Sequence, residues 1–374
     1  MAQLTNDETS TGNLLKASLG VSQPVVSRIP KAAENTNSDV AGARSVRLPA
    51  VDFTKGALVL VMVLYHWLNY FVGAEGYFYR YLGFLPPSFI CITGFLVSYV
   101  YLSKYRVSDR DLPRRLAVRG LKILGIFIVL NLTIGLFVPR FNVGKTGCGM
   151  FSPATLWAIF VSGNMRGARV VAFYVLVPIS YLLLLSSGLL IVSRYSKYIF
   201  HVATGLALLG ILALNVAGDK SQNLELLFIG SLGISIGYIP VGRLNRFLKY
   251  PYLVVIAYLF YVTAITLWNI PYPLQVAGVL LTLMLTYMVG TASGDSHRIP
   301  GTLILLGRYS LFGYIAQIAL LQIMRRLLGG SLPLWALLLS FLGALALTVF
   351  SVETVDRIRA RVPIANRAYG LVFS

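Results

Sequence analysis

Residues 52–67, DFTKGALVLVMVLYHW, decide the fold class, because a strongly apolar run of helical length carries three ionisable side chains. The run belongs to a hydrophobic segment over 51–71, long enough to cross a bilayer core about 30 Å thick as an α-helix. Asp52 and Lys55 lie at its start, and His66 follows Lys55 by eleven residues. A charged side chain at the centre of a membrane helix costs about 2.5 to 3.5 kcal/mol on insertion scales, so its presence favours a functional role.

The composition of the whole chain agrees with a membrane location. Of 374 residues, 57% are hydrophobic and 12% are charged, and the mean hydropathy of +0.74 lies outside the range of soluble globular domains. Ten apolar runs have roughly the length of a span: 51–71, 85–103, 121–139, 171–193, 198–217, 225–241, 251–269, 272–292, 301–324 and 333–352. We therefore predict an all-α polytopic membrane protein with about ten transmembrane helices.

The distribution of Lys and Arg predicts the orientation. The loop 104–122 holds seven basic residues against two acidic ones, which places this loop and both termini in the cytoplasm. We expect a disordered cytoplasmic tail over 1–46, a transmembrane domain over 47–353 and a basic cytoplasmic tail over 354–374. The net charge of +19 resides mostly in short loops, so nucleic-acid binding is not expected. The two cysteines fit neither a metal site nor a disulfide framework, and no metal is predicted.

Helix geometry relates the three ionisable side chains of the first run. Eleven residues turn about 1100°, three turns plus about 20°, and rise about 16 Å, so Lys55 and His66 share one face. Asp52 lies three residues before Lys55 and can pair with it. Lys55 at the cytoplasmic rim predicts a His66 near the bilayer midplane, as the one candidate for an intramembrane general base. Each residue also has a structural alternative. Lys55 then only anchors the helix at the membrane surface, Asp52 interacts with the positive end of the helix dipole, and His66 hydrogen-bonds a neighbouring helix.

The segment RLPAVDFTKGALVLVMVLYH (47–66) resembles the opening signature of the integral-membrane acyltransferase family 3, an Arg or Lys followed by ten residues and a His. Lys55 and His66 match that spacing. Four further segments are similar to family motifs in the same order: FICITGFLVSYVYL (89–102), LPRRLAVRGLKI (112–123), VAFYVLVP (171–178) and LGRYSLFGYIAQI (306–318). The likeness covers about residues 47–325, and a branch near the glucan-succinylating membrane enzymes is one alternative within it.

Two departures from the family pattern concern acid–base groups. The family often carries a Glu just before the Phe-Tyr pair, where this chain has Val170, Val171 and Ala172. The late motif often ends in His, where this chain has Gln317. These changes leave open an altered acceptor chemistry or a loss of activity.

The resemblance implies transfer of an acyl group, usually acetyl, from cytoplasmic acyl-coenzyme A to a hydroxyl of an extracytoplasmic glycan or lipid-linked sugar. His66 would be the base or would carry the acyl group transiently, with Lys55 beside it in the catalytic and donor sites. Arg115 and Arg119 share a helical face with spacing suited to the phosphates of coenzyme A, and Arg114 adjoins them. In the alternative, the three arginines only set the orientation of the chain in the membrane or contact anionic lipid. Tyr174 is the first candidate for an oxyanion donor, or else an interfacial aromatic residue.

Two other classes of function remain open on the sequence. An ion-coupled transporter would use Lys55 and His66 as a relay without a covalent step, and a catalytically silent member would serve as a membrane scaffold. The enzyme reading places the protein in a bacterial inner membrane, with acyl-coenzyme A, the acceptor and membrane lipids as its partners.

Overall fold

The computed structural model describes most of the chain from residue 48 onward. The described residues are 48–73, 77–102, 111–137, 152–164, 172–193, 198–240, 242–243, 249–268, 271–293, 298–329 and 332–373. Arg47–Ser374 form one compact unit. The tail over 1–46, which we predicted to be disordered, lies outside the described residues.

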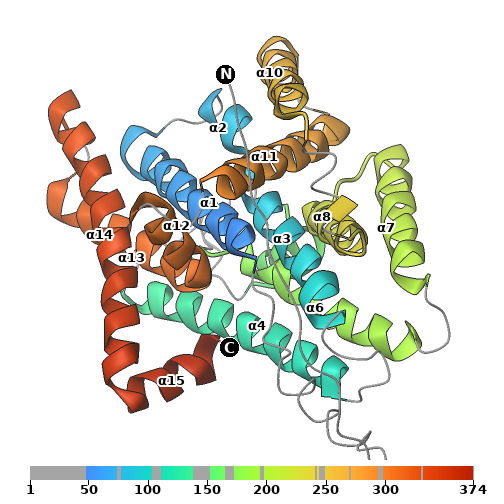
Figure 1. The fold of residues 1–374 in the computed structure, drawn as a ribbon, viewed down its shortest axis with the longest axis horizontal. Helices are drawn as coiled ribbons and strands as arrows, with labels where there is room; N and C mark the ends of the chain where they lie inside the picture. Colours follow the sequence, from blue (N-terminus) through green and yellow to red (C-terminus); the bar gives the residue numbers. More distant parts are fainter. Residues whose placement is uncertain are drawn as a thin grey trace, which may run out of the picture. The chain divides into compact units, whose positions relative to one another are not determined.

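The described part of the chain is helical and contains no strand (Figure 1). Three helices, α1, α3 and α5, widen at their ends into the π-helices η1, η2 and η4. The elements are α1 (Pro49–Trp67), η1 (Leu68–Val72), α2 (Tyr77–Leu82), α3 (Leu85–Leu96), η2 (Val97–Leu102), α4 (Asp111–Phe137), α5 (Pro153–Trp157), η4 (Ala158–Ser162), α6 (Leu176–Ser193), α7 (Ile199–Val216), α8 (Gln222–Gly237), α10 (Pro251–Leu267), α11 (Tyr272–Ala292), α12 (Arg298–Arg308), α13 (Ser310–Leu328), α14 (Leu334–Arg361) and α15 (Pro363–Phe373).

Eight helical segments in the described residues are long and apolar enough to cross a membrane. They correspond to eight of the ten runs expected from the sequence: Pro49–Val72, Arg80–Val100, Asp111–Ile134, Leu176–Ser193, Ile199–Val216, Tyr272–Ala292, Ser310–Leu328 and Leu334–Arg361. The other two expected runs form α8 and α10, which have 16 and 17 residues. The all-α class and the multi-pass character are therefore supported, while the count of ten spans and the cytoplasmic placement of both termini stay predictions.

The run at 301–324 differs from the single span that we expected. It breaks at Tyr309 (φ −105°, ψ 25°) into α12 and α13. The Tyr309 hydroxyl donates a hydrogen bond to Asp356 Oδ1 (2.7 Å) and accepts one from Arg359 Nη1 (3.0 Å). Both of these partners of Tyr309 lie on α14. The run itself contains no proline, so the sequence gives no local signal of a break.

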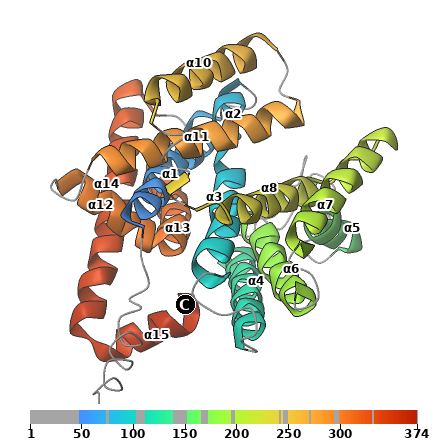
Figure 2. The same ribbon diagram turned by 45° about the vertical axis from the view of Figure 1, so that its right-hand side comes forward.

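The last segment also differs from a simple tail. The domain boundary that we placed at residue 353 lies inside α14, which continues to Arg361. The chain then turns at Val362 into α15, as Figures 1 and 2 both show. The guanidinium carbon of Arg359 lies 4.0 Å from the ring centroid of Tyr369, and the Phe373 ring contacts Phe312 of α13 at 6.1 Å. Residues 354–373 are thus helical and packed against the bundle.

Helix α1 is the centre of the packing, with α3, α11, α12, α13 and α14 against it. Its contact with α12 is a contact between backbones: a methyl group on Gly56 would overlap the carbonyl oxygen of Leu303, and one on Gly307 would overlap that of Asp52. A second pair, α3 and α8, meets in the same way: a methyl group on Gly94 would overlap the carbonyl oxygen of Gly230, and one on Gly233 would overlap that of Cys91. Small residues allow such close approach where lipid removes the hydrophobic drive between helices.

We expect Gly56→Ala to lower the free energy of unfolding by about 1 to 3 kcal/mol, because the added methyl group must push two backbones apart. Gly205→Ala on α7 is the matched control, since its methyl group would meet nothing within 4 Å. Unfolding of both purified variants in mixed detergent–SDS micelles measures the difference. Equal stability of the two variants would contradict this account of the α1–α12 contact.

Candidate functional site

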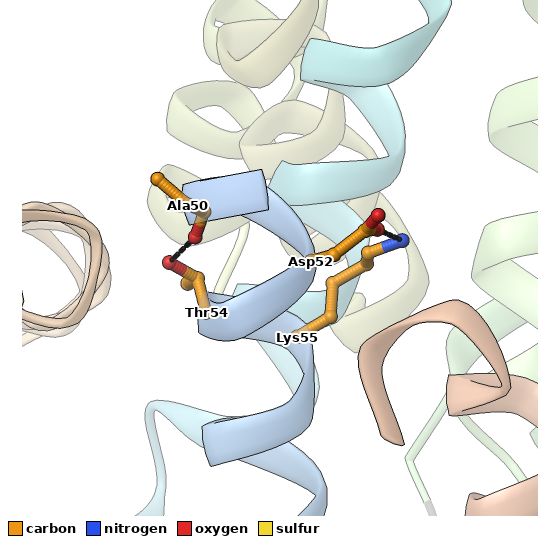
Figure 3. A network of polar contacts seen from close by, with 4 residues as sticks. All are labelled: Ala50, Asp52, Thr54 and Lys55. Atoms are coloured by element: carbon orange, nitrogen blue, oxygen red, sulfur yellow. Dashed lines mark hydrogen bonds and ion pairs between the residues drawn. The ribbon is translucent and has the colours of Figure 1, made fainter. Parts of the chain in front are cut away.

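The first ionisable pair of α1 lies in its first two turns (Figure 3). Lys55 Nζ is 2.6 Å from Asp52 Oδ1, and the two side chains are only 17% and 14% exposed. One turn of the same helix is further tied by Thr54 Oγ1, which donates to the carbonyl oxygen of Ala50 (2.8 Å). The predicted pairing of Asp52 with Lys55 is confirmed.

His66 lies deeper in the same helix. Lys55 and His66 both belong to the uninterrupted α-helix Pro49–Trp67, so the eleven-residue spacing keeps them on one face. The 24-residue span Pro49–Val72 has its centre between Leu60 and Val61, and His66 lies about 8 Å beyond that centre on the side away from Lys55. The depth of His66 in a bilayer, which we expect to be near the midplane, stays a prediction. The π-helix η1 begins two residues after His66, a geometry that is frequent at functional sites.

Aromatic rings surround the His66 imidazole. Its ring centroid lies 5.1 Å from that of Tyr65 and 6.1 Å from that of Tyr314 on α13. Phe173, which precedes α6, meets Tyr314 edge to face at 5.7 Å. The Nε2 atom of His66 is buried and has no hydrogen-bond partner. The imidazole therefore has an unused polar atom inside an apolar enclosure.

Gln317 is a second buried polar group on the same pair of helices. Helix α13 runs in the same direction as α1, since Gly313 lies beside Val59 and Gln322 Nε2 donates to the Tyr70 hydroxyl (3.1 Å). Along α13, Gln317 lies between Gly313 and Gln322, one turn after Tyr314, whose ring lies beside the His66 imidazole. It is fully buried, and neither its Nε2 nor its Oε1 has a hydrogen-bond partner.

Unsatisfied buried polar side chains are few in the described part of the chain. The atoms concerned are His66 Nε2, Thr282 Oγ1, Gln317 Nε2 and Gln317 Oε1. They belong to α1 and to two helices packed against it, α11 and α13. A buried polar group without a partner costs about 1 to 3 kcal/mol, so these atoms of α1, α11 and α13 are the candidates for contact with a ligand. The sequence signal for Gln317 is its place at the end of the late motif, where the family often has His.

Tyr174 is placed in a different polar cluster. Its hydroxyl donates to Asn223 Oδ1, and Asn223 Nδ2 donates to the carbonyl oxygens of Ile159 (3.0 Å) and Val161 (3.3 Å). The cluster ties the start of α6 and the start of α8 to η4. The proton of the Tyr174 hydroxyl is thus engaged with Asn223, while its neighbour Phe173 is the residue that reaches the His66 enclosure through Tyr314.

Asn131 holds Phe173 in position. Its Nδ2 donates to the carbonyl oxygens of Ala172 and Phe127 (both 2.9 Å), and its Oδ1 accepts from the amide of Ala172 (2.9 Å). Phe173 next to this clamp has φ 60°, a left-handed conformation that is unfavourable for a bulky residue. The sequence did not single out Asn131, Phe173 or Tyr314, because the contact joins residues far apart in the chain. Val171, at the missing Glu, lies outside the described residues.

The predicted donor residues lie on the first turns of α4. Arg114, Arg115 and Arg119 are exposed, and the continuous helix Asp111–Phe137 puts Arg115 and Arg119 on one face. Another face of α4 packs on α6, where Ser187 Oγ donates to the carbonyl oxygen of Pro113 (2.7 Å). A shared phosphate site of these arginines with Lys55 stays a prediction.

The chain has no match among protein-family models, curated proteins or solved structures. No group of three or more His, Cys, Asp or Glu side chains that could hold a metal ion occurs within the described ranges.

We expect Gln317→Leu to leave the free energy of unfolding unchanged or to raise it by about 1 kcal/mol, because the variant removes a buried amide that has no partner. Asn131→Leu is the comparison, since it removes a buried amide with three hydrogen bonds and should cost about 2 to 3 kcal/mol. Unfolding in mixed micelles measures both. A loss of stability in Gln317→Leu equal to that of Asn131→Leu would show that Gln317 is a structural residue.

Proposed function

We propose that the protein is a membrane acyltransferase, which moves an acyl group, acetyl in the first instance, from acyl-coenzyme A to a hydroxyl of a glycan or lipid-linked sugar. The observation that carries the proposal is the pair of buried, unpartnered groups at the heart of the bundle, His66 Nε2 and the Gln317 amide. A base, and a donor–acceptor group on a helix packed against it, suit acyl transfer to a hydroxyl. The motif spacing of Lys55 and His66 supports the same class of reaction.

His66 supplies the proton transfer in this proposal. With its imidazole neutral, Nε2 accepts the proton of the acceptor hydroxyl while the hydroxyl oxygen forms a bond to the thioester carbonyl carbon. The carbon–sulfur bond then breaks, the thiolate of coenzyme A leaves, and the proton on His66 passes to that sulfur. Transient attachment of the acyl group to His66 is the alternative route to the same products.

Gln317 takes the role of stabilising the reacting oxygens. Its Nε2 is a donor for the negative charge that develops on the carbonyl oxygen, and its Oε1 is an acceptor for the incoming hydroxyl. We first assigned the oxyanion role to Tyr174, whose hydroxyl donates to Asn223. Gln317 is better suited, since both of its polar atoms are unused and it lies one turn from the ring that contacts His66.

The position of His66 fits a transfer between the two sides of a membrane. Arg114, Arg115 and Arg119 would bind the coenzyme A phosphates at the cytoplasmic side, and Lys55 would lie along the donor's path. The thioester then meets His66 in the half of the span farther from Lys55, which is the half nearer to an extracytoplasmic acceptor. The family resemblance supports assignment to a bacterial inner membrane, and the distribution of Lys and Arg supports both termini in the cytoplasm.

We expect His66→Ala to lower acyl transfer at least about 100-fold, because a positioned general base contributes about 10² to 10⁴ in rate. The assay is transfer from labelled acetyl-coenzyme A to the glycans and lipids of membranes that contain the protein. His201→Ala is the matched control, since His201 is exposed on α7. Undiminished transfer by His66→Ala would overturn the mechanism, and solute flux that depends on His66 without any acylated product would establish the transporter instead.

We expect the double substitution Arg115→Gln and Arg119→Gln to raise the KM for acetyl-coenzyme A by about tenfold or more with kcat unchanged, since each charged hydrogen bond to phosphate contributes about 1.5 to 3 kcal/mol. The increase should shrink at high salt, which screens exposed charges. Arg243→Gln, another exposed arginine, should have no effect on KM. A KM that is the same in wild type and in the double variant would remove both arginines from the donor site.

A further inference from the structure

A groove between α1 and α14 lies apart from the His66 site. It has a volume of about 490 Å³ and is lined by Leu60 of α1 and by six residues of α14: Leu342, Leu345, Ala346, Val349, Phe350 and Glu353. Every lining side chain except Glu353 is apolar. Leu60 follows Lys55 by five residues, about 140° around the helix, so the groove opens on a different face of α1 from the one that carries Lys55 and His66.

The depth of the groove follows from the packing of the two helices. Helix α14 runs opposite to α1, since Trp67 Nε1 donates to Ser340 Oγ (2.8 Å) and Val59 packs with Val352. From Leu342 to Glu353 the groove extends about 16 Å along α14, at 1.5 Å per residue. That length is about half of a hydrocarbon core roughly 30 Å thick. Because Trp67 lies beside Ser340 and Val59 beside Val352, the groove runs from about the level of Trp67 at its Leu342 end to about the level of Val59 at its Glu353 end. Its length is therefore that of one leaflet.

The Glu353 end of the groove carries one charge of each sign. Arg357 Nη2 lies 3.0 Å from Glu353 Oε2, and the two side chains are 67% and 33% exposed. The carboxylate has further acceptor sites, and the guanidinium has further N–H donors. A headgroup with both a primary amine and a phosphate complements this pair, because the amine can donate to Glu353 while the phosphate accepts from Arg357.

We propose that the groove binds one phospholipid of the Glu353-side leaflet, with an acyl chain along α14 and an amine-bearing headgroup at Glu353 and Arg357. The apolar lining, the length of one leaflet and the paired charges at one end each match a different part of such a lipid. The site does not depend on acyl transfer, since it shares neither His66 nor Gln317.

Photocrosslinking to the full-length protein in vesicles tests this proposal. Three lipid probes with the same diazirine-bearing acyl chain are compared: phosphatidylethanolamine, phosphatidylcholine, which lacks N–H donors, and phosphatidylglycerol, which lacks a cation. We expect the ethanolamine probe to label the peptides around Leu60 and Leu342–Phe350 several-fold more than the other two. Equal labelling by all three probes would mean bulk lipid only and would overturn the proposal, as would an unlabelled groove or crosslinks to a second copy of the chain.

Two variants separate the chain site from the headgroup site. Ala346→Trp fills the groove and should reduce labelling several-fold, whereas Leu347→Trp, an exposed neighbour outside the lining, should not. Glu353→Gln combined with Arg357→Gln should abolish the preference among the three headgroups while labelling persists. An unchanged headgroup preference in that double variant would overturn the proposal even where Ala346→Trp fails to fold.

Discussion

The close backbone contact between α1 and α12 is the constraint on which the rest of the structure depends. With no side chain at Gly56 or Gly307, the two helices approach until carbonyl oxygens occupy the space of a methyl group. That approach brings the end of α12 to the first turns of α1, where the chain breaks at Tyr309 and returns as α13 along the same helix. The position of Tyr314 and Gln317 beside α1 follows from this turn.

The buried amides of the protein fall into two kinds. Asn131 and Asn223 each make several hydrogen bonds, and each ties backbone segments that would otherwise leave carbonyl groups unpaired. Gln317 is equally buried and makes none. Proteins satisfy nearly all buried polar groups, and local violations concentrate at functional sites. This contrast within one chain is the physical reason for proposing a functional role for Gln317 and His66.

Part of this arrangement could be predicted from the sequence. Hydropathy gives the class and eight of the expected runs, and helix periodicity places Lys55 and His66 on one face and pairs Asp52 with Lys55. These features depend on residues within a few turns of each other. The break at Tyr309 could not be predicted, because the residues that contact Tyr309 there, Asp356 and Arg359, lie on a later helix.

The site was only partly visible for the same reason. Phe173 reaches Tyr314 across a separation of more than a hundred residues, and no local pattern encodes that contact. Gln317 looked like the loss of a family histidine, and only the structure shows that it is buried without a hydrogen-bond partner. Tyr174 matched a family motif, yet it is the neighbouring Phe173 that contacts Tyr314 beside His66.

The position of α1 at the centre of the bundle has a consequence for the order of assembly. Tyr70 and Trp67 find their partners 252 and 273 residues later, in Gln322 and Ser340. At about 5 to 20 residues per second, a newly inserted α1 waits on the order of 10 to 50 s before those helices leave the ribosome. During that interval α1 lacks these partners, so it reaches its final packing only after the last helices are made.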